Sequence, residues 1–124
     1  DALPILKAVA RTLEQMLRRP PDLVARYGGE EFAAILPETE LDGALAVAEA
    51  MRAGIEGLGI THRFSSTAGV VTVSIGAATM TPDRGDEHGF VSLLKASDEA
   101  LYRAKKNGRN KLAASLSGMT AQIG

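Results

Sequence analysis

The sequence predicts an α/β fold of the α+β type, in which helices flank a mixed, mostly antiparallel β-sheet. Three observations lead to this prediction. The spacing of the hydrophobic residues predicts the elements helix, hairpin, helix, strand, helix and strand, in that order. Such an alternation is typical of helices packed on a sheet. The chain has 124 residues, of which 45% are hydrophobic, so it can bury the core of one domain. It contains no cysteine, which excludes a disulfide framework and thiol catalysis.

The charge of the chain is close to neutral. Lys and Arg number 14 against 15 Asp and Glu, a formal net charge of −1, which argues against the broad basic surface of a nucleic-acid-binding protein. No apolar run approaches the roughly 20 residues of a membrane span, and the first residues do not resemble a signal peptide. We therefore expect a cytoplasmic domain that contacts neither a nucleic-acid polymer nor a membrane.

Three segments carry apolar residues at helical spacing. The first predicted helix starts close to Pro4 and stops at the two prolines of residues 20–21, which end a helix. The second starts near Thr39 or Asp42, either of which can cap it, and ends at two nearby glycines. The third ends at the Asn-Gly pair of residues 107–108.

Residues 23–26 and 32–36 have the composition of two strands joined by a Gly-Gly turn, which predicts a β-hairpin. Residues 70–75 are the strongest strand candidate in the sequence, because they are β-branched almost throughout. A turn-rich connection over residues 76–89 follows this strand and leads into the third helix.

The remaining segments are predicted to be loops, a short strand and a tail. His62 and His88 fall in predicted loops with no partner at metal-ligand spacing, so we expect both to be solvated. The domain is expected to cover residues 1–114, with its last short strand at 111–114. Residues 115–124 contain little that can pack, which predicts a flexible C-terminal tail.

The hairpin turn carries the candidate site. Residues 26–32 are Arg-Tyr-Gly-Gly-Glu-Glu-Phe. Glycines such as Gly28 and Gly29 let a ligand approach the backbone closely, because no Cβ is in the way. Glu30 and Glu31 supply carboxylates suited to a hard cation such as Mg²⁺, which commonly bridges to phosphates. A plain turn with two solvated acids explains the same composition, so the residues alone leave both interpretations open.

This heptapeptide resembles the signature of the GGDEF family of diguanylate cyclases. Residues 71–76 (Val-Thr-Val-Ser-Ile-Gly) are similar to a later strand of the family. Ala-Ser-Asp-Glu-Ala-Leu-Tyr at 96–102, with the Ala-Lys and Gly-Arg-Asn that follow, is similar to its terminal helix and loop. The resemblance covers roughly residues 5–114 and implies the nucleotidyl-cyclase or polymerase-palm-like fold.

The resemblance implies a bacterial signal-transduction enzyme that condenses two GTP molecules into cyclic di-GMP with release of pyrophosphate. It implies Mg²⁺ or Mn²⁺ as the cofactor, since metal ions neutralise phosphate charge in such transfers. It also implies a homodimer, in which each subunit binds one GTP, and an upstream sensory or receiver domain in the intact protein.

The resemblance also implies a role for the hairpin residues. Glu30 corresponds to a catalytic residue that binds the metal, and Glu31 corresponds to the neighbouring catalytic acid. Gly28 and Gly29 correspond to the substrate-binding turn, against which the nucleotide lies.

Lys105 and Arg109 correspond in the same way to the cations that bind the terminal phosphates of the substrate. Without the resemblance, these two side chains are more simply a basic helix C-terminus, which the helix dipole favours.

Arg19 and Asp22 form an Arg-x-x-Asp pattern just before the hairpin. Taken alone, the pattern predicts a surface ion pair worth at most about 1 kcal/mol. Many family members carry an inhibitory product site at this place, and the resemblance implies that Arg19 and Asp22 bind cyclic di-GMP there. The auxiliary arginine of the family falls at Ala50, and Arg52 lies on another face of the helix, which predicts weaker product binding.

The family has one more strand, placed before the first helix, with an Asp-rich segment that binds the metal. Nothing ahead of Asp1 corresponds to this strand or its Asp. We expect that the 124 residues are part of a longer protein, N-terminally truncated here, with a degenerate domain that never had the strand as the alternative. On either interpretation we expect the 124 residues to be inactive on their own. The strand is central in the family's sheet. Its loss predicts an apolar slot between unpaired strand edges.

Two other functions remain open. The chain could be a non-catalytic receptor that binds cyclic di-GMP through Arg19 and Asp22, or a dimerisation module without a nucleotide role. The four other charged residues of the motifs favour the enzyme, because a receptor has no need of them: Glu30, Glu31, Lys105 and Arg109.

Overall fold

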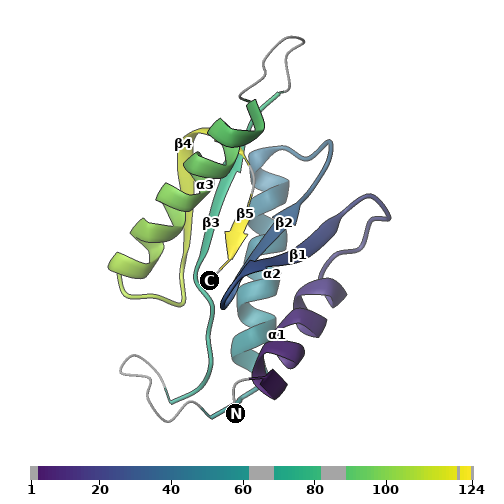
Figure 1. Cartoon of the computed structure of the whole chain (residues 1–124), viewed down its shortest axis with the longest axis vertical. Coiled ribbons are helices and arrows are strands. Elements are labelled where there is room, and N and C mark those ends of the chain that lie inside the picture. The colour runs from purple at the N-terminus through teal and green to yellow at the C-terminus, as the bar shows by residue number, and fades with distance from the viewer. Residues whose placement is uncertain (1–2, 62–68, 82–88, 120, 124) are drawn as a thin grey trace.

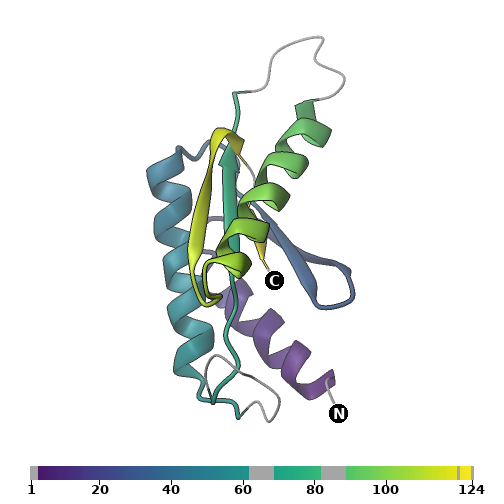
Figure 2. The same cartoon turned by 90° about the vertical axis from the view of Figure 1, so that its left-hand side faces the viewer.

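A computed structural model of the chain describes residues 3–61, 69–81, 89–119 and 121–123. In these residues the elements follow in the order α1 (Leu3–Gln15), β1 (Leu23–Gly28), β2 (Glu31–Ile35), α2 (Leu41–Gly57), β3 (Ile75–Thr79), α3 (Gly89–Lys106), β4 (Leu112–Met119) and β5 (Ala121–Ile123). The strands form one sheet of order β1-β2-β5-β3-β4. Helices α2 and α3 lie on opposite faces of this sheet (Figures 1 and 2), and α1 packs beside α2.

The predicted fold class is confirmed. Strand β1 pairs antiparallel with β2, and β5 pairs antiparallel with both β2 and β3, whereas β3 and β4 are parallel. The sheet is therefore mixed and mostly antiparallel. No helix of the described residues has both the length and the apolar character needed to cross a bilayer.

The first helix and the hairpin follow the sequence pattern closely. Helix α1 buries Val9 and Leu13 and ends at Gln15, a few residues before the prolines expected to stop it. Met16 and Leu17 continue the apolar stripe beyond the helix and pack at the margin of the core. The hairpin pairs β1 with β2 as predicted and contains a bulge at its Gly28 end.

Helix α2 starts without the predicted side-chain cap. Its N-cap residue is Glu40, which makes no capping hydrogen bond through its side chain. The Thr39 hydroxyl donates instead to the carbonyl of Pro37 at 3.0 Å, and Asp42 lies within the first turn, where a carboxylate is favoured by the helix dipole. The buried stripe of α2 is as predicted and consists of Ala44, Ala48, Met51 and Ile55.

The strand predicted at residues 70–75 is wrong in its position. Val70 joins only an isolated bridge to Thr61, and β3 begins at Ile75 and runs through residues assigned to a connection. The β-branched pattern does indicate a buried segment, because Val71 and Val73 are in the core. The strand itself needs small residues, since β3 is covered by helices on both faces. Residues 82–88 of the connection, with His88, and the loop that contains His62 lie outside the described residues.

The C-terminal residues differ most from expectation. Residues 115–124 were expected to form a flexible tail, but β4 extends to Met119 and β5 follows at Ala121–Ile123. Strand β5 lies at the centre of the sheet, where Ile123 pairs with Phe32 of β2 and Ile75 of β3. The expected open slot with unpaired edges is thus occupied over three residues. The physical reason is the full burial of Ile123, at 0% exposure, combined with pairing of two strand edges.

Candidate functional site

The hairpin tip between β1 and β2 carries the Gly-Gly-Glu-Glu segment. Gly29 has a φ of 47°, in the left-handed region that favours glycine, and its carbonyl accepts a 2.7 Å hydrogen bond from Arg26 Nε. A Cβ at Gly28 would have nothing of the described chain within 4 Å, and Gly28 is not left-handed. The fold itself therefore does not require glycine at position 28, where the backbone is open to another molecule.

The two acids of the tip are available for a ligand. Glu30 is exposed and Glu31 is half-buried, and neither takes part in an ion pair with another described residue. In the described part of the chain, no group of three acidic or histidine side chains comes together as a metal site. Glu30 and Glu31 fit a Mg²⁺ ion only as a partial ligand set, of the kind that substrate phosphates complete.

The loop after α3 has a well-defined local geometry. Helix α3 ends in a Schellman motif, in which the amide of Arg109 donates to the Ala104 carbonyl at 3.1 Å and that of Gly108 to the Lys105 carbonyl at 3.4 Å. Gly108 has a φ of 121°, and Arg109 and Asn110 follow at 62° and 49°. A non-glycine residue held in this region costs on the order of 1–3 kcal/mol. Asn tolerates it better than Arg does.

Asn110 is the residue that ties this loop to the rest of the domain. Its backbone amide donates to Ser74 Oγ at 3.1 Å, and Ser74 is buried immediately before β3. Its side-chain nitrogen donates to Glu56 Oε2 at 2.7 Å, and its side-chain oxygen accepts from an Arg52 guanidinium nitrogen at 2.9 Å. Helix α2 therefore supports the loop directly.

Lys105 and Arg109 are the two cations expected to bind phosphates. Lys105 is half-buried near the end of α3, and Arg109 is exposed in the loop. Neither forms an ion pair with a carboxylate of the described residues. Both positive charges are therefore available to an anion.

The strand directions bring the acids and the cations to one edge of the sheet. Strands β2 and β3 are both antiparallel to β5 and hence parallel to each other, and β4 is parallel to β3. All three begin at the same edge, which we call the tip edge. The hairpin tip with Glu30 precedes β2, and the loop with Arg109 precedes β4 (Figure 1). Sequence reasoning predicted these residues separately, and the topology places them at a common edge.

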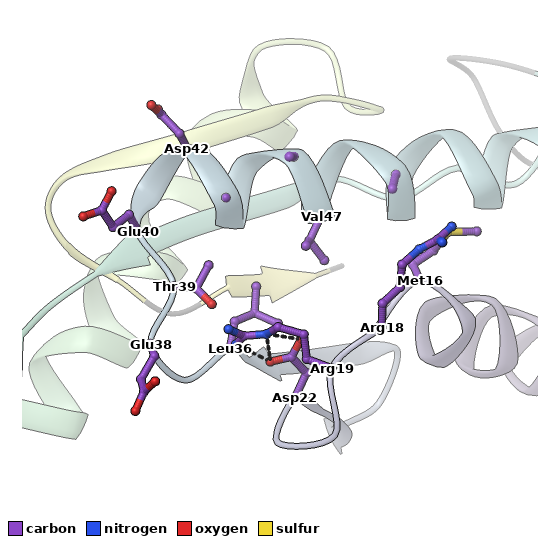
Figure 3. A pocket seen from close by; sticks show the side chains of 13 residues that line it. Met16, Arg18, Arg19, Asp22, Leu36, Glu38, Thr39, Glu40, Asp42 and Val47 are labelled. Carbon is purple, nitrogen blue, oxygen red and sulfur yellow. Dashed lines mark hydrogen bonds and ion pairs between the residues drawn. The ribbon is translucent and has the colours of Figure 1, made fainter.

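The opposite edge, where β1 begins and β2 ends, holds a cavity of about 570 Å³, and we call it the cavity edge. The wall of the cavity comes from the α1–β1 connection, the end of β2 and the first half of α2, and includes Arg19, Asp22 and Ala50. Figure 3 shows Leu36 and Val47 close to the Arg19–Asp22 pair. The sequence predicted Arg19 and Asp22 as a pair, and the structure places them in one cavity.

Arg19 and Asp22 are already bonded to each other. The Arg19 guanidinium lies 2.7 Å from Asp22 Oδ1 through one terminal nitrogen and 3.2 Å from Oδ2 through Nε, and it also donates to the carbonyl of Pro37. The Asp22 side chain is only 5% exposed, against 44% for Arg19. The hydrogen bond to Asp22 raises the pKa of Arg19 above its ordinary value.

The cavity wall carries more negative than positive charge. Its carboxylates are Asp22, Glu38, Glu40 and Asp42, whereas its cations are Arg18 and Arg19. Glu40 and Asp42 point away from the Arg19–Asp22 pair (Figure 3). Ala50, which also lines the wall, adds no charge, so the cavity has little positive charge to offer an anionic ligand.

The family model "Diguanylate cyclase, GGDEF domain" matches residues 4–111 of the chain. The chain belongs to the GGDEF family. The GGDEF domain is 46% identical over 112 residues to diguanylate cyclase DgcM of Escherichia coli K12, a match that covers 89% of this chain and 24% of that protein. It is 44% identical over 92 residues to response regulator PleD of Caulobacter vibrioides, covering 74% of this chain and 20% of that protein. It therefore spans about a fifth to a quarter of these relatives.

Solved structures agree with the family. The coiled coil and GGDEF domain of DgcB from Caulobacter crescentus, in complex with c-di-GMP, superimposes with a TM-score of 0.71 and 28% identity, covering 90% of this chain and 56% of that one. The GGDEF fold predicted from the sequence is confirmed, and diguanylate cyclases of this family are metal-dependent. The roles of the individual site residues remain predictions.

Sequence reasoning missed one part of the site in the GGDEF domain. Arg52 does lie away from the cavity, as its spacing from Ala50 predicted, but its partner Asn110 is 58 residues away in sequence. The acids at positions 49 and 56 were a usable signal, because charges three and four residues apart on a helix pair with each other. No local pattern indicated that Asn110 joins them.

Proposed function

We propose that this GGDEF domain, within its full-length protein, condenses two GTP molecules into cyclic di-GMP and pyrophosphate. One observation supports the proposal: the strand directions bring Glu30, Glu31, Lys105 and Arg109, none of which has an ion-pair partner among the described residues, to the same edge of the sheet. Phosphoryl transfer from a nucleoside triphosphate needs carboxylates for a metal ion and cations for the phosphates.

In this proposal the residues of the tip edge bind one GTP. Lys105 and Arg109 bind the terminal phosphates, and their charges favour pyrophosphate as the leaving group. The backbone at Gly28 and Gly29 accommodates the nucleotide, which accounts for a glycine at position 28 that the fold does not need.

Glu30 is the carboxylate that we assign to Mg²⁺ or Mn²⁺, because it is exposed at the tip and has no ion-pair partner among the described residues. When bound, the ion supplies neutralisation of phosphate charge. The tip acids are a partial ligand set, so phosphate oxygens and a ligand from outside the described residues complete the coordination.

The reaction forms two bonds, each between the 3′-oxygen of one GTP and the α-phosphorus of the other, and each bond formed breaks the bond from that α-phosphorus to its pyrophosphate group, so two pyrophosphates leave. Glu31, half-buried beside Glu30, is positioned to accept the hydroxyl proton. One domain binds one GTP, so two copies must face each other, and the active form is a homodimer. An upstream sensory or receiver domain would bring the copies together, and the response regulator PleD is similar to this chain over a fifth of its length.

The decisive experiment incubates the full-length protein with GTP and Mg²⁺ and measures cyclic di-GMP by chromatography and mass spectrometry. We expect turnover in the wild type and a loss of at least about 100-fold in Glu30→Gln, because a charged ligand of the metal and phosphates is removed. Glu14→Gln, at an exposed position of α1, is the matched control. Full activity of Glu30→Gln would contradict the assignment, and robust turnover by the 124-residue fragment would contradict the expected missing ligand.

We also propose that cyclic di-GMP binds in the cavity edge as an inhibitory product. The support is a cavity of about 570 Å³ that contains Arg19 and Asp22, a cation for the guanine edge or phosphate and an acceptor for guanine nitrogens. A ligand that binds the Arg19 nitrogens already in use displaces their hydrogen bonds to Asp22 and Pro37. Together with the excess of carboxylates, this displacement predicts weak binding.

Calorimetry on the full-length protein separates the remaining functions. We expect both cyclic di-GMP and a non-hydrolysable GTP analogue to bind, with Arg19→Ala losing the first ligand and Lys105→Ala weakening the second. A receptor would bind only cyclic di-GMP, and a dimerisation module would bind neither. The proposed reaction uses GTP, so we place the domain in the cytoplasm, where GTP is made and used.

A further inference from the structure

We propose that Arg52 and Glu56 of α2, acting through Asn110, are positioning residues that hold Arg109 at the tip edge for a triphosphate. The inference rests on the proposed function for the identity of the anion that Arg109 binds. The network itself rests on contacts between described residues.

The conformation of the loop cannot come from local preference alone. Arg109 and Asn110 are consecutive residues with φ angles of 62° and 49°, and a long side chain such as Arg rarely adopts this region. The Schellman motif accounts for Gly108, where α3 ends, but it does not hold the two residues after it. Contacts from elsewhere in the fold must hold them.

Asn110 receives those contacts from two directions. Its backbone amide is fixed by the buried Ser74 hydroxyl, and both ends of its side-chain amide are fixed by Arg52 and Glu56. The residue next to Arg109 is therefore bonded on its backbone and its side chain. This confines the direction in which the chain, and with it the Arg109 side chain, leaves α3.

Arg52 is itself committed to the fold and is not free to bind a ligand. Its Nε and one terminal nitrogen contact Glu49, at 2.9 Å and 2.5 Å, and its other terminal nitrogen contacts Glu56 at 3.1 Å as well as Asn110. The Arg52 side chain is 18% exposed. Its planar fork therefore satisfies two carboxylates and one amide oxygen at once, a geometry that Lys cannot reproduce.

The consequence for the reaction is specific. Arg109 is exposed and lacks an ion-pair partner among the described residues, so within this part of the chain the position of its side chain depends on the backbone that the network fixes. Releasing the loop would spread the guanidinium over many positions and weaken triphosphate binding. Among the described residues, no hydrogen bond joins the hairpin tip with Glu30 to the network, so the transfer step should change less than binding does.

The test uses the full-length protein and three readouts: amide hydrogen exchange over residues 107–111, calorimetry with a non-hydrolysable GTP analogue, and KM against kcat for GTP. Arg52→Ala removes the fork, and Arg52→Lys retains only the charge. Asn110→Gly keeps a residue that accepts positive φ but lacks the side-chain bonds. Arg11→Ala, at an exposed arginine of α1 without a partner in the described part of the chain, is the control.

We expect Arg52→Ala and Asn110→Gly to speed loop exchange, to raise the Kd for the analogue and the KM for GTP by about tenfold, and to change kcat by less than about threefold. Arg52→Lys should recover little, and Arg11→Ala should change nothing. The deciding comparison is Arg52→Ala made in an Arg109→Ala background. If Arg52 acts through Arg109, the second substitution should leave the Kd unchanged, because the interaction it supports is already lost.

The proposal is overturned if Arg52→Ala weakens analogue binding equally with and without Arg109, or if loop exchange rises while the Kd stays the same. It is also overturned if Arg109→Ala alone leaves the Kd unchanged while the protein still makes cyclic di-GMP. Failure of the proposed function gives a different result, in which the wild type neither binds the analogue nor makes product.

Discussion

The two edges of the sheet carry charged residues in opposite states. At the cavity edge, Arg19 and Asp22 are bonded to each other, and Arg19 also donates to the carbonyl of Pro37. At the tip edge, Glu30 and Arg109 have no ion-pair partner among the described residues. The Arg19–Asp22 pair of the cavity edge is satisfied without a ligand, whereas Glu30 and Arg109 at the tip edge have no such partner among the described residues.

This difference predicts how each edge responds to a ligand. An anion at the tip edge meets a free cation on a loop that is already held in place, so little reorganisation opposes binding. A ligand at the cavity edge must first replace an existing hydrogen-bonded ion pair, which costs part of the binding energy. The tip edge suits a substrate, and the cavity edge suits a weaker regulatory ligand.

The strongest test of the rigid support behind the tip edge is Gly76→Ala. Gly76 lies where β3 meets α3, and an added Cβ would come within 2.1 Å of the Leu101 nitrogen and 2.3 Å of the Ser97 oxygen, both backbone atoms. Backbone cannot move aside as a side chain can, so we expect the free energy of unfolding to fall by at least about 3 kcal/mol. Urea denaturation measures it.

Gly54→Ala is the matched control for this prediction. A Cβ there would approach side-chain atoms and no backbone, namely Met16 Cε at 2.9 Å, the end of a flexible side chain, and Thr12 Cγ2 at 3.2 Å. Alanine is also the better helix former. The net change in unfolding free energy should be within about 1 kcal/mol. If Gly76→Ala lowers the free energy of unfolding no more than Gly54→Ala does, β3 and α3 do not pack as closely as in this structure.

The centre of the sheet, which joins the two edges, is tested by Ile123→Ala. Ile123 is fully buried between β2 and β3, so truncation should lower the free energy of unfolding by about 2–4 kcal/mol. Thermal or urea denaturation measures the change, with Leu58→Ala, at an exposed position, as the control. A loss below about 0.5 kcal/mol would mean that residues 121–123 do not occupy the sheet in solution.

The cavity edge is tested by adding the charge that it lacks. Ala50 lines the cavity on α2, and Ala50→Arg would place a guanidinium in the wall beside Arg19. A charge-assisted contact to a phosphate is worth about 1.5 kcal/mol, which corresponds to roughly tenfold tighter binding of cyclic di-GMP by calorimetry. Ala50→Gln, similar in length but uncharged, should give much less. Unchanged affinity in both variants would place the ligand elsewhere.

Local patterns in the sequence predicted the three helices, the hairpin and the Arg19–Asp22 pair, because each depends on spacing within a few residues. They placed β3 wrongly. The β-branched residues indicated a buried segment, but the strand itself begins later and needs the small Gly76 where it packs against α3. They also missed β5. Its three residues, Ala-Gln-Ile, carry no strand signal, and their pairing depends on the two strand edges available in the fold.

The candidate site shows the same limit. Motif resemblance supplied Glu30, Lys105 and Arg109 as candidates, but it could not show that they share an edge, which follows from strand directions. The support of the loop was also hidden, because Arg52 and Asn110 are 58 residues apart. Contacts of that range are set by packing, which local patterns do not encode.

The smallest effect concerns the acid that completes the network behind the tip edge. The hydrogen bond from Arg52 holds the pKa of the Glu49 carboxyl below its ordinary value of 4.5. A carboxyl with a lowered pKa stabilises the fold above its ordinary pKa, and this stabilisation is lost as the pH falls through the lower, folded-state value. Glu49→Gln should therefore destabilise at pH 7, and its effect should shrink as the pH is lowered toward 3. Because the Glu49 side chain is 51% exposed, the effect at pH 7 should be only a few tenths of a kcal/mol.

Urea denaturation at pH 7 and pH 3 measures the effect of Glu49→Gln, with Glu14→Gln as the exposed control. A difference that persists at pH 3 would mean that Glu49 supports Arg52 by packing and not by charge, and the network would then be less sensitive to acid than the ion pairs imply.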